Sequence, residues 1–104
     1  MAICVHYDFA GGTLEQYDQV AQRMGFRPGG VGSPGMLFHW ITKTGEGIRV
    51  TDVWEIRERC EQFFQERAGP AIAEVGVPGP PKITFFEVHN YLTKGGSIIG
   101  CYPS

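Results

Sequence analysis

Short runs rich in β-branched and aromatic residues occur four times along the chain. Each run ends at a cluster of Gly, Pro or small polar residues, which is the pattern of a strand followed by a turn. Strands are therefore predicted over residues 3–9, 36–42, 48–55 and 82–89. The polar, Gly-containing segment 43–47 is short enough to join the second and third strands as an antiparallel hairpin.

Two stretches between these strands have apolar residues at helical spacing instead. The first, after Thr13, has the form of a capping box with Gln16, continues with a stripe that begins at Leu14 and Tyr17, and stops at Gly25. The second starts at Ile56, is expected to break at Gly69-Pro70, and resumes over 71–75. The segment 77–81, rich in Pro, cannot be helical and leads to the last strand.

The order of elements is thus β-α-β-β-α-β, which predicts an α+β domain of the ferredoxin-like class. In that class two right-handed crossovers place both helices on one face of a four-stranded antiparallel sheet. Residues 1–92 are assigned to this domain, and residues 93–104 to a C-terminal tail that either forms a short strand or is disordered.

Both faces of the predicted sheet are apolar, whereas a sheet with one solvated face should alternate apolar with polar residues. One face is expected to be a seam with a second copy, and the other to lie under the helices and carry the polar groups. A large exposed apolar face is unusual in a monomer, so a homodimer is predicted, the alternative being that the tail covers the sheet. The expected seam is Ile3, Val5, Tyr7, Phe9, Met36, Phe38, Trp40, Thr51, Val53, Thr84, Phe86 and Val88; the expected inner face is Cys4, His6, Asp8, Leu37, His39, Ile41, Val50, Asp52, Trp54, Ile83, Phe85, Glu87 and His89.

Composition and charge limit the classes of partner that are expected. The 104 residues suit one domain, and a net charge of −2 without a Lys/Arg cluster gives no reason to expect nucleic acid. No apolar stretch approaches the roughly 20 residues that a membrane span needs. The first eight residues form a strand pattern rather than a leader, and the three cysteines lack metal-binding spacing, so a cytoplasmic protein with reduced thiols is expected.

Several segments together resemble the dimeric α/β-barrel superfamily, and within it small proteins similar to antibiotic-biosynthesis monooxygenases. The resemblance spans residues 2–92 and is carried by the order of elements and by the segments 11–18, 37–39, 50–55 and 88–90. It implies a homodimer with a cavity between sheet and helices in which His or Tyr side chains act. The superfamily includes cofactor-free oxygenases, haem-degrading enzymes, isomerases and polyketide cyclases, so the resemblance predicts the fold and leaves the reaction open.

The candidate catalytic residues are His6, His39, Asp52 and Tyr17. The two histidines and Asp52 are expected on the inner face of the sheet, where a carboxylate would orient an imidazole and keep it basic, and Tyr17 would reach the same place from the first helix. The alternative is that these histidines are hydrogen-bonded core or edge residues. A metal site of two His and one carboxylate, or a haem held by one His, is a weaker alternative, and no metal or cofactor is predicted.

The candidate ligand-binding residues are Trp54, His89, Phe85 and Phe64, because an aromatic lining suits a planar hydrophobic ligand. The segment Gly30–Gly35 matches the letters of a dinucleotide-binding motif, but it follows a helix and precedes a strand, so a phosphate site is rejected. It is either a mobile loop over the cavity mouth or a plain connection.

Three functions remain open from the sequence. The first is a monooxygenase-like enzyme without bound cofactor, in which His6 or His39 removes a proton from a small aromatic or polyketide-like molecule, Asp52 orients the imidazole and Tyr17 hydrogen-bonds the developing oxyanion. The second is a non-catalytic, ligand-binding or stress-related dimer. The third is an isomerase or cyclase that works through an enolate on the same fold.

Overall fold

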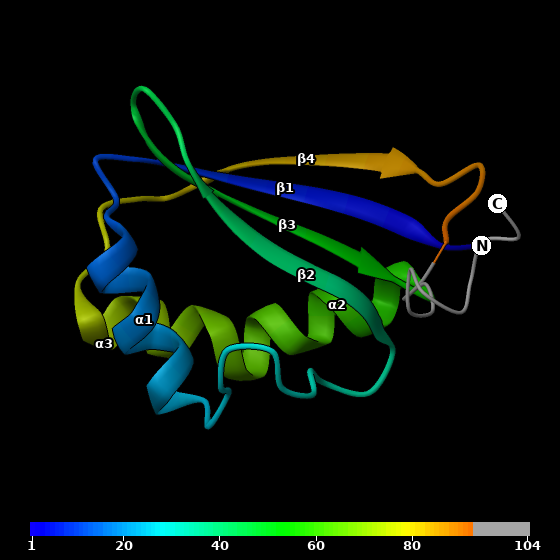
Figure 1. Ribbon diagram of the computed structural model, residues 1–104, viewed down its shortest axis with the longest axis horizontal. Coiled ribbons are helices and arrows are strands. Elements are labelled where there is room, and N and C mark those ends of the chain that lie inside the picture. Colours follow the sequence, from blue (N-terminus) through cyan, green and yellow to red (C-terminus); the bar gives the residue numbers. More distant parts are fainter. Residues whose placement is uncertain (93–104) are drawn as a thin grey trace, which may run out of the picture.

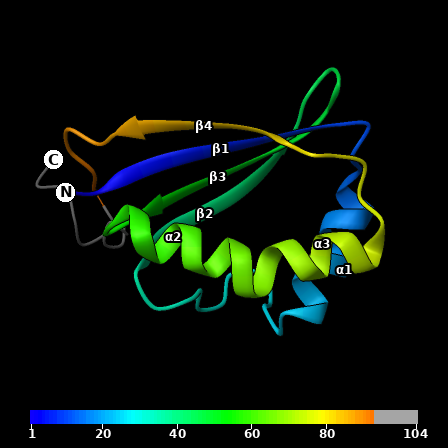
Figure 2. The same ribbon diagram turned by 180° about the vertical axis from the view of Figure 1, so that it is seen from behind.

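The computed structural model describes residues 1–92, and the tail from residue 93, with the strand considered there and Cys101, lies outside the described residues. The elements follow the order β1 (Ile3–Ala10), α1 (Leu14–Arg23), β2 (Met36–Lys43), β3 (Gly47–Trp54), α2 (Arg57–Phe63), a π-helical turn η1 (Phe64–Ala68), α3 (Gly69–Val75) and β4 (Lys82–Glu87). The four strands form one antiparallel sheet in the order β2-β3-β1-β4. Figure 1 and Figure 2 show that the helices all lie on one face of this sheet. The ferredoxin-like α+β arrangement predicted from the sequence is confirmed.

Helix α1 begins as its sequence indicates. The Thr13 hydroxyl accepts from the Gln16 backbone N–H, and the Gln16 side chain accepts from the Thr13 N–H, both at 3.1 Å. At the other end Gly25 has a φ of +80°, and the Phe26 N–H donates to the Ala21 carbonyl, which satisfies the orphan carbonyl of the last turn. Both ends of the helix therefore have interactions between residues that are close together in the sequence.

The predicted break at Gly69-Pro70 is wrong. Helix α2, η1 and α3 follow without interruption, and Figure 2 shows them as one long helix beneath the sheet. A proline inside an α-helix loses a hydrogen bond and clashes with the preceding turn. Here the wider turn of η1 comes directly before Pro70, and the Gly69 N–H donates five residues back to the Phe64 carbonyl. This local widening lets the helix pass the proline.

The assignment of faces needs correction in β1. Val5, Tyr7 and Phe9 are buried beneath the helices, so they are not part of an outer seam. Each pairs with an inward residue of β3; Val5, for example, is the partner of Asp52. Met36 is also turned toward the core, because a bulge shifts the register between Met36 and Phe38.

The sheet face opposite the helices, called here the outer face, keeps the apolar residues expected of β2 and β4. Phe38, Trp40 and Phe86 are 37%, 46% and 47% exposed. No helix among residues 1–92 covers this face, so it carries a patch of aromatic side chains.

A chain of hydrogen bonds from Tyr17 to Trp54

Four side chains from three elements are linked by hydrogen bonds between the sheet and the helices. The Tyr17 hydroxyl of α1 hydrogen-bonds His39 Nε2 of β2. His39 Nδ1 in turn contacts Asp52 Oδ1 of β3 at 2.5 Å, and the Trp54 indole N–H donates to Asp52 Oδ2 at 3.2 Å. These four residues are called the relay below.

The sheet register explains why these residues meet. His39 and Asp52 are directly opposite one another on the neighbouring strands β2 and β3. Trp54 is two residues after Asp52, so both side chains leave β3 on the same face. Tyr17 lies on the sheet-facing side of α1, with its ring stacked on the His39 ring at 5.7 Å between centroids and 18° between planes.

The side chains of the relay differ in how far they are buried. Asp52 is 3% exposed and Trp54 is fully buried, whereas the His39 side chain is 31% exposed. A buried carboxylate needs hydrogen-bond donors, and Asp52 has one on each oxygen. The relay therefore runs from a buried, doubly hydrogen-bonded carboxylate to a phenol near the surface.

The contacts of His39 fit the tautomer that carries the ring proton on Nδ1. With Nδ1–H donating to Asp52, the neutral His39 ring presents the lone pair of Nε2, and the Tyr17 hydroxyl donates to it. Burial raises the pKa of the Tyr17 phenol, and the nearby carboxylates of Asp52 and Asp18 raise it further. Tyr17 is thus a phenol at neutral pH, in contact with an imidazole that can accept its proton.

Two of the predicted site histidines are not in this group. His6 is on the outer face, because its neighbour Val5 is the inward residue of β1; the His6 ring meets Phe86 edge-on at 5.0 Å. His89 comes after the end of β4 and is exposed. The expectation that His6, His39, Asp52 and His89 all project from the inner face is therefore wrong for His6, and the relay contains one histidine.

The predicted ligand-binding aromatics are distributed over the core. Trp54 packs against Phe63 at 5.3 Å. Phe64 stacks on Tyr7 at 5.3 Å, and the Arg57 guanidinium lies 3.9 Å from the centre of the Phe85 ring. Phe64 and Phe85 are half-buried, whereas Trp54 has no exposed surface and acts in this structure as a donor to Asp52.

Sequence reasoning missed a second buried polar contact next to the relay. The Tyr7 hydroxyl and the Cys60 thiol are 3.3 Å apart in the core. Burial is the main reason that the pKa of the Cys60 thiol is raised to about 11, and the pKa of Tyr7 is raised as well. Both groups stay protonated, so this pair is a buried hydrogen bond rather than a reactive thiol. The placement of Tyr7 on the wrong face concealed it.

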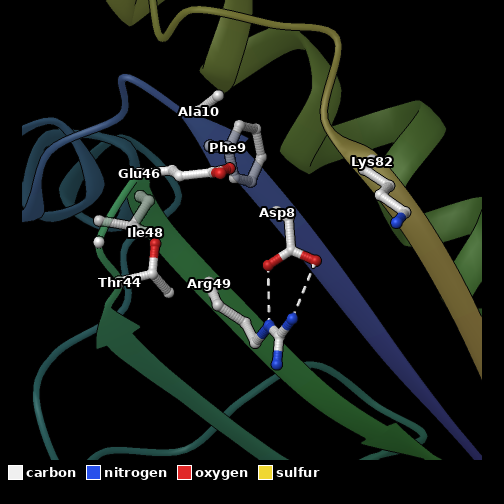
Figure 3. A pocket seen from close by; sticks show the side chains of 9 residues that line it. Asp8, Phe9, Ala10, Thr44, Glu46, Ile48, Arg49 and Lys82 are labelled. Atoms are coloured by element: carbon white, nitrogen blue, oxygen red, sulfur yellow. Dashed lines mark hydrogen bonds and ion pairs between the residues drawn. The ribbon is translucent and has the colours of Figure 1, made fainter.

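Two surface clefts lie away from the relay. One, of about 320 Å³, is bordered by Gln19, Gln22 and Arg23 on α1. The other, of about 440 Å³, lies at the end of the sheet between β1, the β2–β3 turn and β4. Figure 3 shows that Asp8 and Arg49 face each other there, with contacts of 2.7 and 3.3 Å. Neither cleft is lined by Tyr17, His39 or Asp52.

The relay does not gather the ligands of a metal ion. Within residues 1–92 no group of three His, Cys, Asp or Glu side chains is placed to hold one. His39 and Asp52 come together, but His6 is on the other face of the sheet. In the same part of the chain no helix is long and apolar enough to cross a membrane.

Three solved structures that resemble this chain are of proteins called monooxygenases or oxygenases. A protein from Deinococcus radiodurans assigned as an antibiotic-biosynthesis monooxygenase aligns over 92% of this chain and 100% of its own, with a TM-score of 0.58 and 15% identity. A monooxygenase from the gene ActVA-Orf6 of Streptomyces coelicolor, in complex with nanaomycin D, aligns over 90% and 92%, with a TM-score of 0.54 and 20% identity.

A third neighbour is a mutant of SnoaB, a cofactor-independent oxygenase from Streptomyces nogalater, which aligns over 89% of this chain and 96% of its own. Its TM-score is 0.56 and its identity 12%. No protein-family model and no curated protein sequence matches the chain. At these identities the likeness concerns the fold: this chain has the ferredoxin-like fold of the antibiotic-biosynthesis monooxygenases.

Proposed function

We propose that the protein is a monooxygenase that needs no bound cofactor and acts on a small hydroxylated aromatic molecule, with the relay as its proton acceptor. The observation that carries this proposal is the hydrogen-bonded chain Tyr17–His39–Asp52. It combines a phenol near the surface, an imidazole nitrogen that can accept the phenol's proton and a buried carboxylate, on a fold shared with proteins that are called monooxygenases.

In this proposal the residues have other roles than those expected from the sequence. Tyr17 occupies His39 Nε2, so the imidazole does not meet a substrate directly. The substrate proton goes to the Tyr17 oxygen while the Tyr17 proton moves to Nε2. Asp52 then stabilises the imidazolium that forms, because its carboxylate already contacts Nδ1. Tyr17 is the catalytic residue in this scheme, and His39 and Asp52 act through it.

The chemistry then balances without a cofactor. An anthrone-type substrate loses a proton from its CH2 group, and the carbanion, delocalised over the rings, gives one electron to O2. The radical and superoxide combine to a peroxide at that carbon, which takes back the proton. Loss of water leaves a C=O group, so one oxygen atom enters the product and the other becomes water. The oxidant is O2, and the substrate supplies the electrons.

The test uses dithranol, a dihydroxyanthrone, with ¹⁸O-labelled O2. We expect one ¹⁸O atom in the quinone product and a loss of about 10²–10⁴-fold in kcat/KM for His39→Ala, which is the usual size of an acid–base contribution. His6→Ala is the matched control, because His6 lies on the other face of the sheet. Equal activity of His39→Ala and the native protein would overturn the proposal.

The same experiment separates the alternatives. Turnover in the absence of O2, with no label in the product, would favour an isomerase or cyclase that uses the same proton transfer. Saturable binding of nanaomycin D without any turnover of dithranol would favour a ligand-binding protein. The homodimer and the cytoplasmic location also stay proposals; the aromatic outer face supports the first of these.

A further inference from the structure

The part of the chain between Phe26 and Gly35 is attached to the rest of the protein mainly at its two ends. At one end the Phe26 N–H donates to the Ala21 carbonyl, and at the other the Gly35 carbonyl accepts from the Glu55 N–H. Between these anchors the backbone hydrogen bonds found in the described chain are local, from Gly30 to Arg27 and from Met36 to Ser33. Segment 27–34 is therefore a strap held to the body by side chains.

The side chain of Arg67 contacts the strap at one residue and the chain just before the strap at another. Arg67, from η1, donates to the Met24 carbonyl at 2.6 Å and reaches the Ser33 hydroxyl at 3.5 Å. Its guanidinium also lies 5.3 Å from the ring centre of Phe26 and 5.8 Å from that of Phe63. Arg67 thus connects the end of α1, the strap and the long helix at one point.

The surface next to the strap leads to the relay. Phe26 packs on Phe63 at 6.1 Å, and Phe63 packs on Trp54, whose N–H holds Asp52. The position of a Cβ on Gly32 would be 2.6 Å from the sulfur of Met36, so the strap rests on Met36, which is opposite Trp54 in the sheet. Phe26, Phe63 and Trp54 thus form a run of packed aromatic side chains between the strap and the relay.

The strap has the properties of a movable element. Val31 is 91% exposed, so an apolar side chain at its tip is in water and gains from closing over an apolar ligand. Gly29 and Gly35 have φ angles of +70° and +87°, a region that favours glycine and provides points of rotation. A segment with few buried apolar contacts and few backbone hydrogen bonds to its surroundings opens at low free-energy cost.

We propose that segment 27–34 is a gate, latched by Arg67, that opens to admit a planar hydrophobic substrate onto the Phe63–Trp54 surface beside the relay. This rests on the proposed function for the identity of the substrate, but the motion itself is tested without it. Trp54 has no exposed surface and neither described cleft borders the relay, so a ring system needs such an opening to reach the Phe63–Trp54 surface.

The test measures access to Trp54. The chain has two tryptophans, so Trp40→Phe, on the outer face, leaves Trp54 as the only indole fluorophore. In that background we expect weak quenching by acrylamide, and a rise of about threefold or more in the quenching constant for Arg67→Ala, because the opened population grows. Arg67→Lys keeps the positive charge but loses the planar guanidinium, so its quenching constant should lie between those of the native residue and Arg67→Ala.

Arg23→Ala is the matched control. It removes an arginine that pairs with Glu74 at 2.9 Å between α1 and α3 and makes no hydrogen bond with segment 27–34 of the described chain, so it should leave the quenching constant unchanged. Hydrogen exchange followed by mass spectrometry should show faster exchange in Arg67→Ala for residues 27–34 but not for β1 or β3, which separates opening from general destabilisation.

The possible results separate a failure of the gate from a failure of the proposed function. Unchanged quenching in Arg67→Ala, or an equal rise in Arg23→Ala, would overturn the gate and leave the relay untouched. A rise in quenching together with undiminished dithranol turnover in His39→Ala would support the gate and overturn the proposed chemistry.

Discussion

The indole N–H of Trp54 donates to Asp52 Oδ2, and both residues are buried. The other oxygen of Asp52 contacts His39, so the orientation of the carboxylate is set from two sides. The sequence predicts that Trp54 lines a ligand pocket; in this structure its indole N–H also positions the carboxylate that contacts the histidine.

Trp54→Phe should separate the contribution of the hydrogen bond to Asp52 from that of the packing of the aromatic ring. It keeps an aromatic ring against Phe63 but leaves one buried oxygen of Asp52 without a donor, which costs about 1–3 kcal/mol of unfolding free energy. The pH profile of turnover should also change, because the carboxylate is freer to rotate away from His39. Urea unfolding and a pH–rate profile would measure the two effects. Trp40→Phe is the control, and equal behaviour of the two variants would contradict a positioning role.

Tyr17→Phe tests whether the phenol is part of the proton path. We expect the kcat of dithranol oxidation to fall by about 10²-fold or more, in line with loss of an acid–base group, while the folded structure persists. If the Tyr17→Phe variant keeps partial activity and that activity still requires His39, the scheme holds, because Nε2 then faces the substrate directly. Full activity across the pH range would show that the phenol takes no part.

The contact between Tyr7 and Cys60 makes a prediction about alkaline pH. The pKa of the Cys60 thiol in the folded protein is about 11, above its ordinary value of 9.0, and burial is the main cause. The unfolded chain therefore loses this proton first, so stability should be level below pH 9 and fall as the pH rises toward 11. Urea midpoints measured from pH 7 to pH 11 would show the slope, and Cys60→Ala should reduce it. An identical slope in that variant would assign the effect to other groups.

The π-helical turn predicts an unusual requirement for glycine at position 69. A Cβ on Gly69 would be 2.9 Å from the Phe64 carbonyl oxygen, so Gly69→Ala should destabilise the protein by about 1–3 kcal/mol although alanine favours helices. Gly45→Ala, at a site where nothing lies within 4 Å, is the matched control. Thermal unfolding of both variants gives the comparison, and a neutral or stabilising Gly69→Ala would mean that the turn readily rearranges.

The outer face predicts the state of association. If a second copy covers Trp40, Trp40→Glu should weaken the homodimer by more than about tenfold, since a central interface aromatic contributes about 2 kcal/mol. Size-exclusion chromatography with light scattering at several concentrations would show the shift to monomer. Val31→Glu, at an exposed apolar residue outside the sheet, should leave the mass unchanged. A native protein that is monomeric at all concentrations would refute the proposal.

Local sequence signals were sufficient for the elements and their order. The capping box at Thr13, the glycine stop at Gly25 and the β-branched runs act over a few residues, so their physics is visible in the sequence. The exception is Gly69-Pro70, where the sequence indicates a break and η1 removes the clash by widening one turn. That rescue depends on the helix being packed against the sheet, which gives a continuous helix more contacts than a broken one.

The residues of the relay could be named in advance only in part. His39 and Asp52 were placed on one face correctly, because the short turn between β2 and β3 leaves few possible registers for this hairpin. Tyr17 was expected to reach the same place from α1, and it does, but its bond to Nε2 depends on how the helix sits on the sheet. The catalytic roles stay predictions.

The sequence by itself determined the β-α-β-β-α-β order, the two ends of α1 and the presence of two apolar sheet faces, because these follow from local propensity and periodicity. Only the tertiary structure decided which face of β1 is buried. Pairing of β1 with β3 is long-range, and a shift of one residue would exchange Val5 and Tyr7 for His6 and Asp8. The structure settles this by burying Val5, Tyr7 and Phe9 under the helices, which removes His6 from the site and leaves His39 with Asp52 and Tyr17.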